Sequence, residues 1–185
     1  MKANKRRLIG SAAEELRRLL NITDGNFDIE EVVSRLNGKI EYFSGYDEGC
    51  AEDVMKGGGQ VQTSKQKDEN ASFVIRINED NVKMRQRFSI AYELGHLFLH
   101  MRYFSDKWDS LPNGEKYNWE LGSYSVKEEE ANEFAGAFLM PEQLFIKKAI
   151  ETGSESRCSL EKIAEFFNVS VSDAFYRGRN LGLWR

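Results

Sequence analysis

The segment from Tyr92 to His96 has the sequence YELGH and carries residue types found in hydrolytic metal sites. It differs at one position from H-E-x-x-H, in which two histidines four residues apart on a helix bind zinc. The glutamate of that motif takes a proton from metal-bound water as the water attacks a peptide carbonyl. The segment therefore indicates a peptidase site, a relic of one, or a helix that carries one structural histidine.

The residues around this segment, 87–101, have the pattern of an amphipathic helix with a core stripe of Phe88, Ala91, Leu94, Phe98 and Met101. Tyr92 and His96 are four residues apart, so they project from the same face one turn apart. Gly95 inside a helix costs about 1 kcal/mol relative to alanine. This cost indicates that another part of the molecule, or a ligand, approaches the backbone at Gly95.

A second helix is predicted from Ser125 to about Met140, with a buried stripe of Ala131, Ala135, Phe138 and Leu139. Helical rotation places Glu128 and Asn132 on or beside that stripe, and it predicts that three other acids point away: Glu129, Glu130 and Glu133. An inward carboxylate is costly unless it meets a cation, a metal or hydrogen-bond donors. The structural alternative for Glu128 is a capping box that begins at Ser125.

Taken together, RFSIAYELGHLFLH and the later EEEANEFAGAFLMP resemble two motifs of the ImmA/IrrE family of zinc metallopeptidases. Members of that family typically show R-F-[ST]-[IL]-A-H-E-L-G-H and E-x-x-A-N-x-F-A-x-x-L-M-P. The resemblance extends over most of the chain. It implies an α+β fold with a zincin-like core, in which a small twisted sheet packs on helices and zinc is bound by two histidines and a glutamate.

The resemblance also implies a role for each matching residue. His96 corresponds to the second histidine ligand, Glu93 to the catalytic base and Glu128 to the third ligand. Asn132 would orient His96 from outside the ligand set. Tyr92 stands where the family has its first zinc-binding histidine.

Tyr92 makes zinc binding weak or absent, because a phenol of pKa about 10 must lose its proton to bind metal, at roughly 4 kcal/mol. We hypothesise that its hydroxyl occupies or borders the zinc position and hydrogen-bonds to Glu128, His96 or both. In one alternative, the chain is an active zinc endopeptidase in which Tyr92 or a water completes the ligand set. In another, Tyr92 is an introduced substitution in an active enzyme.

His100 lies four residues after His96, so the two could form an H-x3-H metal pair. The segment between them, Leu97-Phe98-Leu99, contains no base. A hydrogen-bonded role for His100, either structural or just outside the metal ligands, is therefore favoured.

The 185 residues suffice for one domain with a small appendage, and the net charge of −4 gives no overall field for nucleic acid or membrane. The N-terminus lacks an apolar signal segment and no stretch is long enough to span a membrane, so a cytoplasmic protein without a membrane partner is expected. Elsewhere the pattern predicts helices to Leu20 and over 29–36, strands over 39–43 and 72–78, and a loop or hairpin tip over 56–72.

Two domains are predicted: a zincin-like peptidase-type domain over 1–155 and a helix-turn-helix-like segment over 156–185, with helices near 160–167 and 170–180. As a DNA reader its second helix would present Ser172, Tyr176, Arg177 and Arg179. The segment is only weakly basic. Docking onto the first domain or onto a repressor is therefore favoured over direct DNA binding.

These features predict an ImmA/IrrE-type metallopeptidase homologue in regulation, of the kind often encoded on phages and other mobile elements. It would act on or bind a helix-turn-helix repressor or an antitoxin, with proteolysis impaired or absent because of Tyr92. An active zinc endopeptidase that cleaves a repressor is the alternative, and a DNA-binding regulator is the third hypothesis.

Overall fold

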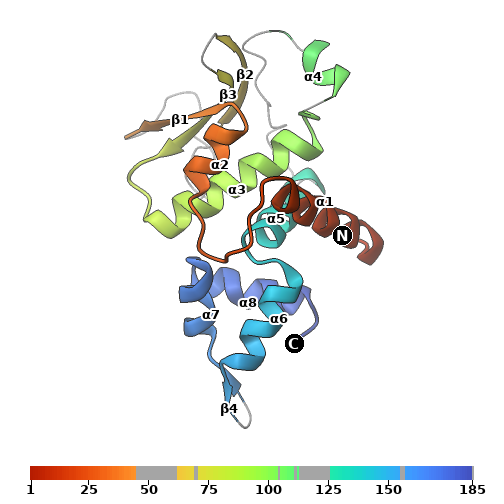
Figure 1. Ribbon diagram of the computed structural model, residues 1–185, viewed down its shortest axis with the longest axis vertical. Helices are drawn as coiled ribbons and strands as arrows, with labels where there is room; N and C mark the ends of the chain where they lie inside the picture. The colour runs from red at the N-terminus through yellow and green to blue at the C-terminus, as the bar shows by residue number, and fades with distance from the viewer. Residues whose placement is uncertain are drawn as a thin grey trace.

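The computed structural model describes residues 1–44, 62–68, 71–103, 105–110, 112, 126–154 and 157–184. Its helices in those ranges are α1 (Ala3–Leu19), α2 (Ile29–Arg35), α3 (Lys83–Leu99), α4 (Asp106–Ser110), α5 (Val126–Leu139), α6 (Glu142–Glu151), α7 (Leu160–Phe167) and α8 (Val171–Asn180). Its strands are β1 (Gly38–Phe43), β2 (Gln62–Asp68), β3 (Ala71–Asn78), β4 (Gly153–Ser154) and β5 (Arg157–Cys158). The fold is thus α+β, with a small sheet at one end of a helical body (Figure 1).

The sheet has β3 at its centre, with β1 parallel to it on one side and β2 antiparallel on the other. Gly38 lies opposite Phe73 in the register, and a Cβ atom on Gly38 would overlap the Phe73 ring at 2.3 Å. Phe73, Ile75 and Ile77 alternate along β3 and are buried, so one face of the strand covers the helical core. The strands predicted over 39–43 and 72–78 are therefore confirmed.

The segment predicted as a loop or hairpin tip, 56–72, contains β2, so the loop prediction is wrong for residues 62–68. Their backbone pairs with β3, although the sequence QTSKQKD has no apolar alternation. A strand at the edge of a sheet has a neighbour on one side only and tolerates polar and charged residues, which is why hydrophobic periodicity misses it. Residues 56–61, which include the triple glycine, and residues 69–70 lie outside the described residues. Residues 71–72, the end of the segment, belong to β3.

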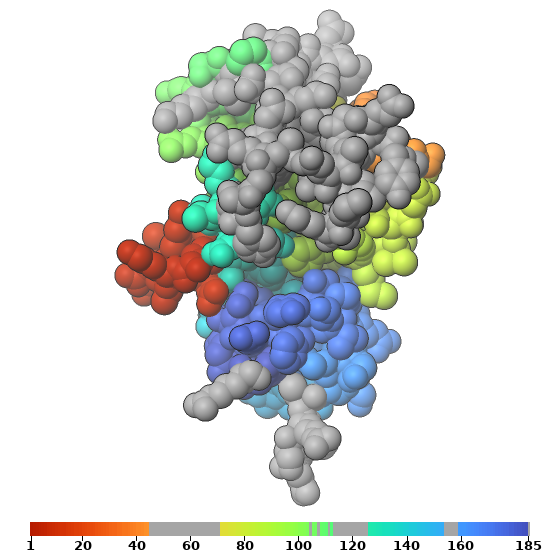
Figure 2. Space-filling model, turned by 180° about the vertical axis from the view of Figure 1, so that it is seen from behind, coloured from red at the N-terminus to blue at the C-terminus, as the bar shows by residue number. Residues whose placement is uncertain are grey.

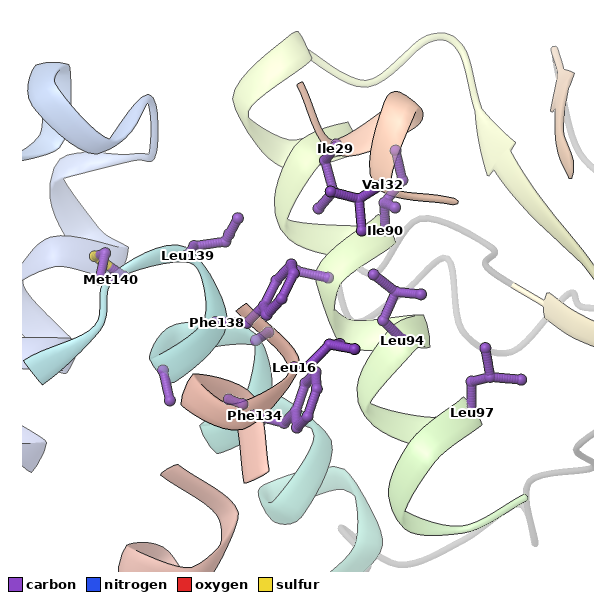
Figure 3. Packing of buried hydrophobic residues seen from close by; sticks show 14 of the residues in the cluster. Leu16, Ile29, Val32, Ile90, Leu94, Leu97, Phe134, Phe138, Leu139 and Met140 are labelled. Carbon is purple, nitrogen blue, oxygen red and sulfur yellow. The ribbon is translucent and has the colours of Figure 1, made fainter. Parts of the chain in front are cut away.

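The core forms where α1, α2, α3 and α5 meet (Figure 3). Of the stripe predicted on α3, Ala91, Leu94 and Met101 are buried, whereas Phe88 and Phe98 are half-buried. Other residues of α3 are also buried, including Ile90 and Leu97. Because other parts of the protein cover α3 on more than one side, its buried polar side chains must find hydrogen-bond partners inside the protein.

The C-terminal helices α6, α7 and α8 extend the same apolar core, and the rings of Phe145 and Phe167 stack there with centroids 5.8 Å apart. The turn between α7 and α8 contains Asn168 in the left-handed conformation (φ 52°), and Ser170 and Asp173 form a capping box at the start of α8. The predicted helix, tight turn and second helix are thus confirmed. The division into two domains stays a prediction. None of the described helices combines the length and apolar character needed to cross a membrane.

Candidate functional site

The middle of α3 lies directly against α5 at Gly95. A Cβ atom on Gly95 would be 3.1 Å from both the Cα and the carbonyl oxygen of Ala131, and 3.2 Å from the Cβ of Phe134. Contacts this short leave little room for any side chain larger than hydrogen. The approach to the backbone predicted at Gly95 is therefore made by α5, and it brings the YELGH segment beside EEEAN.

Tyr92 and Glu128 meet across this helix pair. The Tyr92 hydroxyl donates a hydrogen bond to the Glu128 carboxylate, and both side chains are half-buried. The Tyr92 ring also lies edge-on against the imidazole of His96, with ring centroids 4.7 Å apart. The predicted hydrogen bond between Tyr92 and Glu128 is confirmed, and the two motifs converge on one place.

His96 is fully buried, and its Nδ1 lies 2.7 Å from Nδ1 of His100. The Nε2 atom of His100 lies 3.5 Å from the Glu130 carboxylate. Burial, with smaller effects from His100 and Lys127, lowers the pKa of His96 to about 2. Burial also lowers the pKa of His100, against the opposing effect of Glu130, so both rings are neutral at pH 7. His100 is thus a hydrogen-bonded neighbour of His96, in the manner favoured from the sequence.

Glu93 and Asn132 complete the set of predicted site residues. Glu93 follows Tyr92 on α3 and is buried, with 1% of its surface exposed. Asn132 lies one turn after Glu128 on α5, and its Nδ2 donates to the backbone carbonyl of Glu128 at 3.0 Å. The roles of Glu93 as a base and of Asn132 in orienting His96 stay predictions.

The prediction that Glu130 and Glu133 point away from the core is wrong, because both are buried. Glu130 pairs with Lys5 of α1, while Glu133 lies 3.1 Å from Nε of Arg6 and 3.0 Å from a terminal nitrogen of Arg177. The basic start of α1 is therefore not a solvated face alone, because α1 lies beside α5 (Figure 2) and its Lys5 and Arg6 pair with acids of α5. The signal in the sequence for these contacts was the opposite charge of two distant segments, the basic start of α1 and the acidic residues of α5.

Comparison with known proteins identifies the family of this chain. The family model of a peptidase family, described as the IrrE N-terminal-like domain, matches residues 52–177. This chain belongs to that family.

Among solved structures, the chain resembles a Mycobacterium tuberculosis transcriptional regulator, with a TM-score of 0.52 and 16% sequence identity over 95% of this chain. Sequence identity at this level shows a shared fold and no more. The match covers 47% of the regulator, so the chain spans about half the length of that protein. The search of curated proteins finds no match.

Peptidases of the IrrE N-terminal-like family are typically zinc-dependent, but His96 and His100 as arranged here do not form a zinc-binding pair. Two nitrogens that bind one tetrahedral zinc at about 2.0–2.1 Å lie about 3.3 Å apart. The facing nitrogens of His96 and His100 are closer, at 2.7 Å, and are joined by a hydrogen bond. Across the described part of the chain, no three histidine, cysteine, aspartate or glutamate side chains are grouped so that they could hold a metal.

Of the four residues of α8 that were considered from the sequence for reading DNA, three are exposed and one is buried. Ser172, Tyr176 and Arg179 of α8 are exposed, but Arg177 is only 5% exposed. Its Nε donates to the carbonyl of Met140 at 2.9 Å, in addition to the ion pair with α5. The expectation that Arg177 would face DNA is wrong, because the buried acid on α5 holds it against the core.

A pocket of about 580 Å³ opens between α1, α3, α5 and α8, and its lining includes Phe88, Asn132, Gly136 and Tyr176. Phe88 precedes Tyr92 by one helical turn, and Asn132 follows Glu128 by one turn, so the pocket adjoins the candidate site. Sequence patterns on single helices gave no sign of this pocket, because four separate helices form it.

Proposed function

We propose that this chain is a regulatory member of the IrrE N-terminal-like family that binds a helix-turn-helix repressor or an antitoxin and cleaves it poorly or not at all. The observation that supports the proposal is the hydrogen bond from Tyr92 to Glu128. Tyr92 stands where the family has a zinc-binding histidine, and its hydroxyl contacts the carboxylate that would be another ligand. The phenol of Tyr92 thus gives the Glu128 carboxylate a hydrogen-bond donor, where a metal would otherwise neutralise its charge.

Zinc binding at this place has two costs besides the loss of one imidazole. Deprotonating a phenol of pKa about 10 at pH 7 costs roughly 4 kcal/mol. Breaking a hydrogen bond to a charged carboxylate costs about 1.5–3 kcal/mol more. The sum, about 6 kcal/mol, corresponds to roughly a 10⁴-fold loss of affinity. Of the roughly 10–16 kcal/mol found for structural zinc sites, about 4–10 kcal/mol would remain before the loss of one imidazole is counted.

A regulatory role is supported by the family and by the fold shared with a transcriptional regulator. The helix-turn-helix-like segment is held against α5 by the buried pair of Arg177 and Glu133, which favours a protein-binding function over DNA reading. The repressor or antitoxin partner follows from the resemblance to the ImmA/IrrE family. Binding without cleavage would sequester such a partner.

The test is metal content and cleavage in three proteins: wild type, Tyr92→His and Tyr92→Phe. We expect stoichiometric zinc, and cleavage of a helix-turn-helix repressor from the same genome, only in Tyr92→His. Tyr92→Phe is the control, because it removes the hydroxyl without supplying a ligand. The wild type should bind the same repressor intact, as measured by isothermal titration calorimetry.

Two results would overturn the proposal. One is tight stoichiometric zinc in the wild type with Tyr92 among its ligands. The other is equal cleavage by wild type and Tyr92→His, which would establish the alternative of an active endopeptidase with Glu93 as its base.

A further inference from the structure

A chain of polar contacts links α1 to the buried imidazole of α3. Lys5 of α1 pairs with one oxygen of Glu130 on α5, and the other oxygen lies 3.5 Å from Nε2 of His100. His100 in turn contacts His96 through the two Nδ1 atoms, 2.7 Å apart. His96 is 0% exposed and Glu130 is 8% exposed, so protein atoms surround these two groups, whereas the Lys5 side chain at the other end of the series is 50% exposed.

The distances restrict where the ring hydrogens lie. Two ring nitrogens at 2.7 Å form a hydrogen bond only if one carries a hydrogen and the other a lone pair. A carboxylate oxygen is an acceptor, so the His100 nitrogen that faces Glu130 must be the one that carries the hydrogen. The reverse arrangement would place a lone pair of His100 against a negatively charged oxygen.

We propose that Glu130 is a positioning residue that fixes His100 as the Nε2–H tautomer and, through it, His96 as the Nδ1–H tautomer. The hydrogen between the rings then belongs to His96, and the lone pair of His96 lies on Nε2. A neutral imidazole with its lone pair on one defined nitrogen is the form in which histidine binds metals or accepts hydrogen bonds. Glu130, which is not in the predicted ligand set, thus prepares His96 for such a contact.

Tautomers are read directly by long-range ¹H–¹⁵N correlation NMR of the imidazole rings in ¹⁵N-labelled protein. In the wild type we expect the Nε2–H pattern for His100 and the Nδ1–H pattern for His96. In Glu130→Ala we expect one or both rings to change tautomer or to show a mixture. Glu130→Gln should restore the wild-type pattern, because its amide oxygen can still accept the hydrogen of His100.

The matched control is Glu129→Ala, which removes the neighbouring acid and its ion pair with the Met1 amino group but leaves Glu130 in place. It should leave both tautomers unchanged. A wild-type spectrum with Nδ1–H on His100, or a wild-type pattern retained in Glu130→Ala, would overturn the proposal. If Glu130→Ala does not fold, the wild-type spectrum still decides the assignment.

A second measurement uses the Tyr92→His variant and rests on the proposed function. Zinc affinity should fall ten- to a hundredfold when Glu130→Ala is added, which is the usual effect of losing a partner that orients a ligand, and should not change with Glu129→Ala. Equal zinc affinity in all three proteins would count against Glu130. Failure of Tyr92→His itself to bind zinc would instead count against the proposed function, while the tautomer spectra would still test Glu130.

Discussion

Two carboxylates of α5, Glu128 and Glu133, are satisfied in different ways. Glu133 accepts from Arg177 and Asn180 and pairs with Arg6, so charged and amide groups from two other helices enclose it. Glu128 accepts from the neutral phenol of Tyr92. The first arrangement is that of a structural ion pair, whereas the second involves the acid that the sequence predicts as a metal ligand. Changes at Glu133 should therefore act on stability, and changes at Tyr92 should act mainly on ligand chemistry.

The largest effect on stability is expected for Arg177→Met. Removing one partner of a buried ion pair leaves the other charge without compensation, which costs about 3–5 kcal/mol. Urea unfolding should show this loss in the free energy of unfolding. Arg179→Met is the matched control on the same helix, and because Arg179 is exposed it should stay within about 0.5 kcal/mol of wild type. Equal stabilities would show that the pair with Glu133 does not hold α8 to the core.

Gly95→Ala and Gly136→Ala compare the tight contact of α5 with α3 and its looser contact with α8. At Gly95 the added methyl meets backbone at 3.1 Å, so we expect a loss of about 1–3 kcal/mol. At Gly136 the nearest atom is Cδ of Arg177 at 3.8 Å, so the higher helix propensity of alanine should stabilise the protein by about 0.5–1 kcal/mol. Both are read as shifts in the urea midpoint, and the same sign for both variants would contradict the difference in packing.

Acid should destabilise the protein through His96. Its folded-state pKa of about 2 lies below the ordinary value of 6.5, so below pH 6.5 the unfolded chain binds more protons than the folded one. Stability is therefore complete above pH 6.5 and falls as the pH decreases towards 2, by about 1.4 kcal/mol per pH unit from this residue. Urea unfolding between pH 7.5 and 5.5 measures the slope, which should be smaller in His96→Gln. An unchanged slope in that variant would show that other groups cause the dependence.

The smallest effect is expected for Tyr92→Phe, which removes the hydroxyl that donates to Glu128. We expect a loss of about 1 kcal/mol, because the half-buried carboxylate regains part of its hydration. Tyr176→Phe, at an exposed tyrosine of α8, is the control and should be neutral. A loss as large as that of Arg177→Met would show that Tyr92 is chiefly structural and would remove the contrast between the two acids.

The sequence predicted most helices and two strands of the sheet because their apolar residues recur at the spacing of each element. It missed β2, since an edge strand needs no apolar alternation. The meeting of Tyr92 with Glu128 was predicted, because the two motifs fix which helix faces converge. The burial of Glu133 was not, because its partners Arg6 and Arg177 are distant in the chain and no helical pattern reveals them.

The residues that match the family model do not include β1, although β1 pairs in parallel with β3 and is needed for the fold. A fragment cut to the matched residues, 52–177, would lack α1, α2 and β1. Its β3 would expose unbonded amide and carbonyl groups along one margin, and Glu130 and Glu133 would lose Lys5 and Arg6. Such a fragment should self-associate, so recombinant work on the matched residues needs the preceding residues as well.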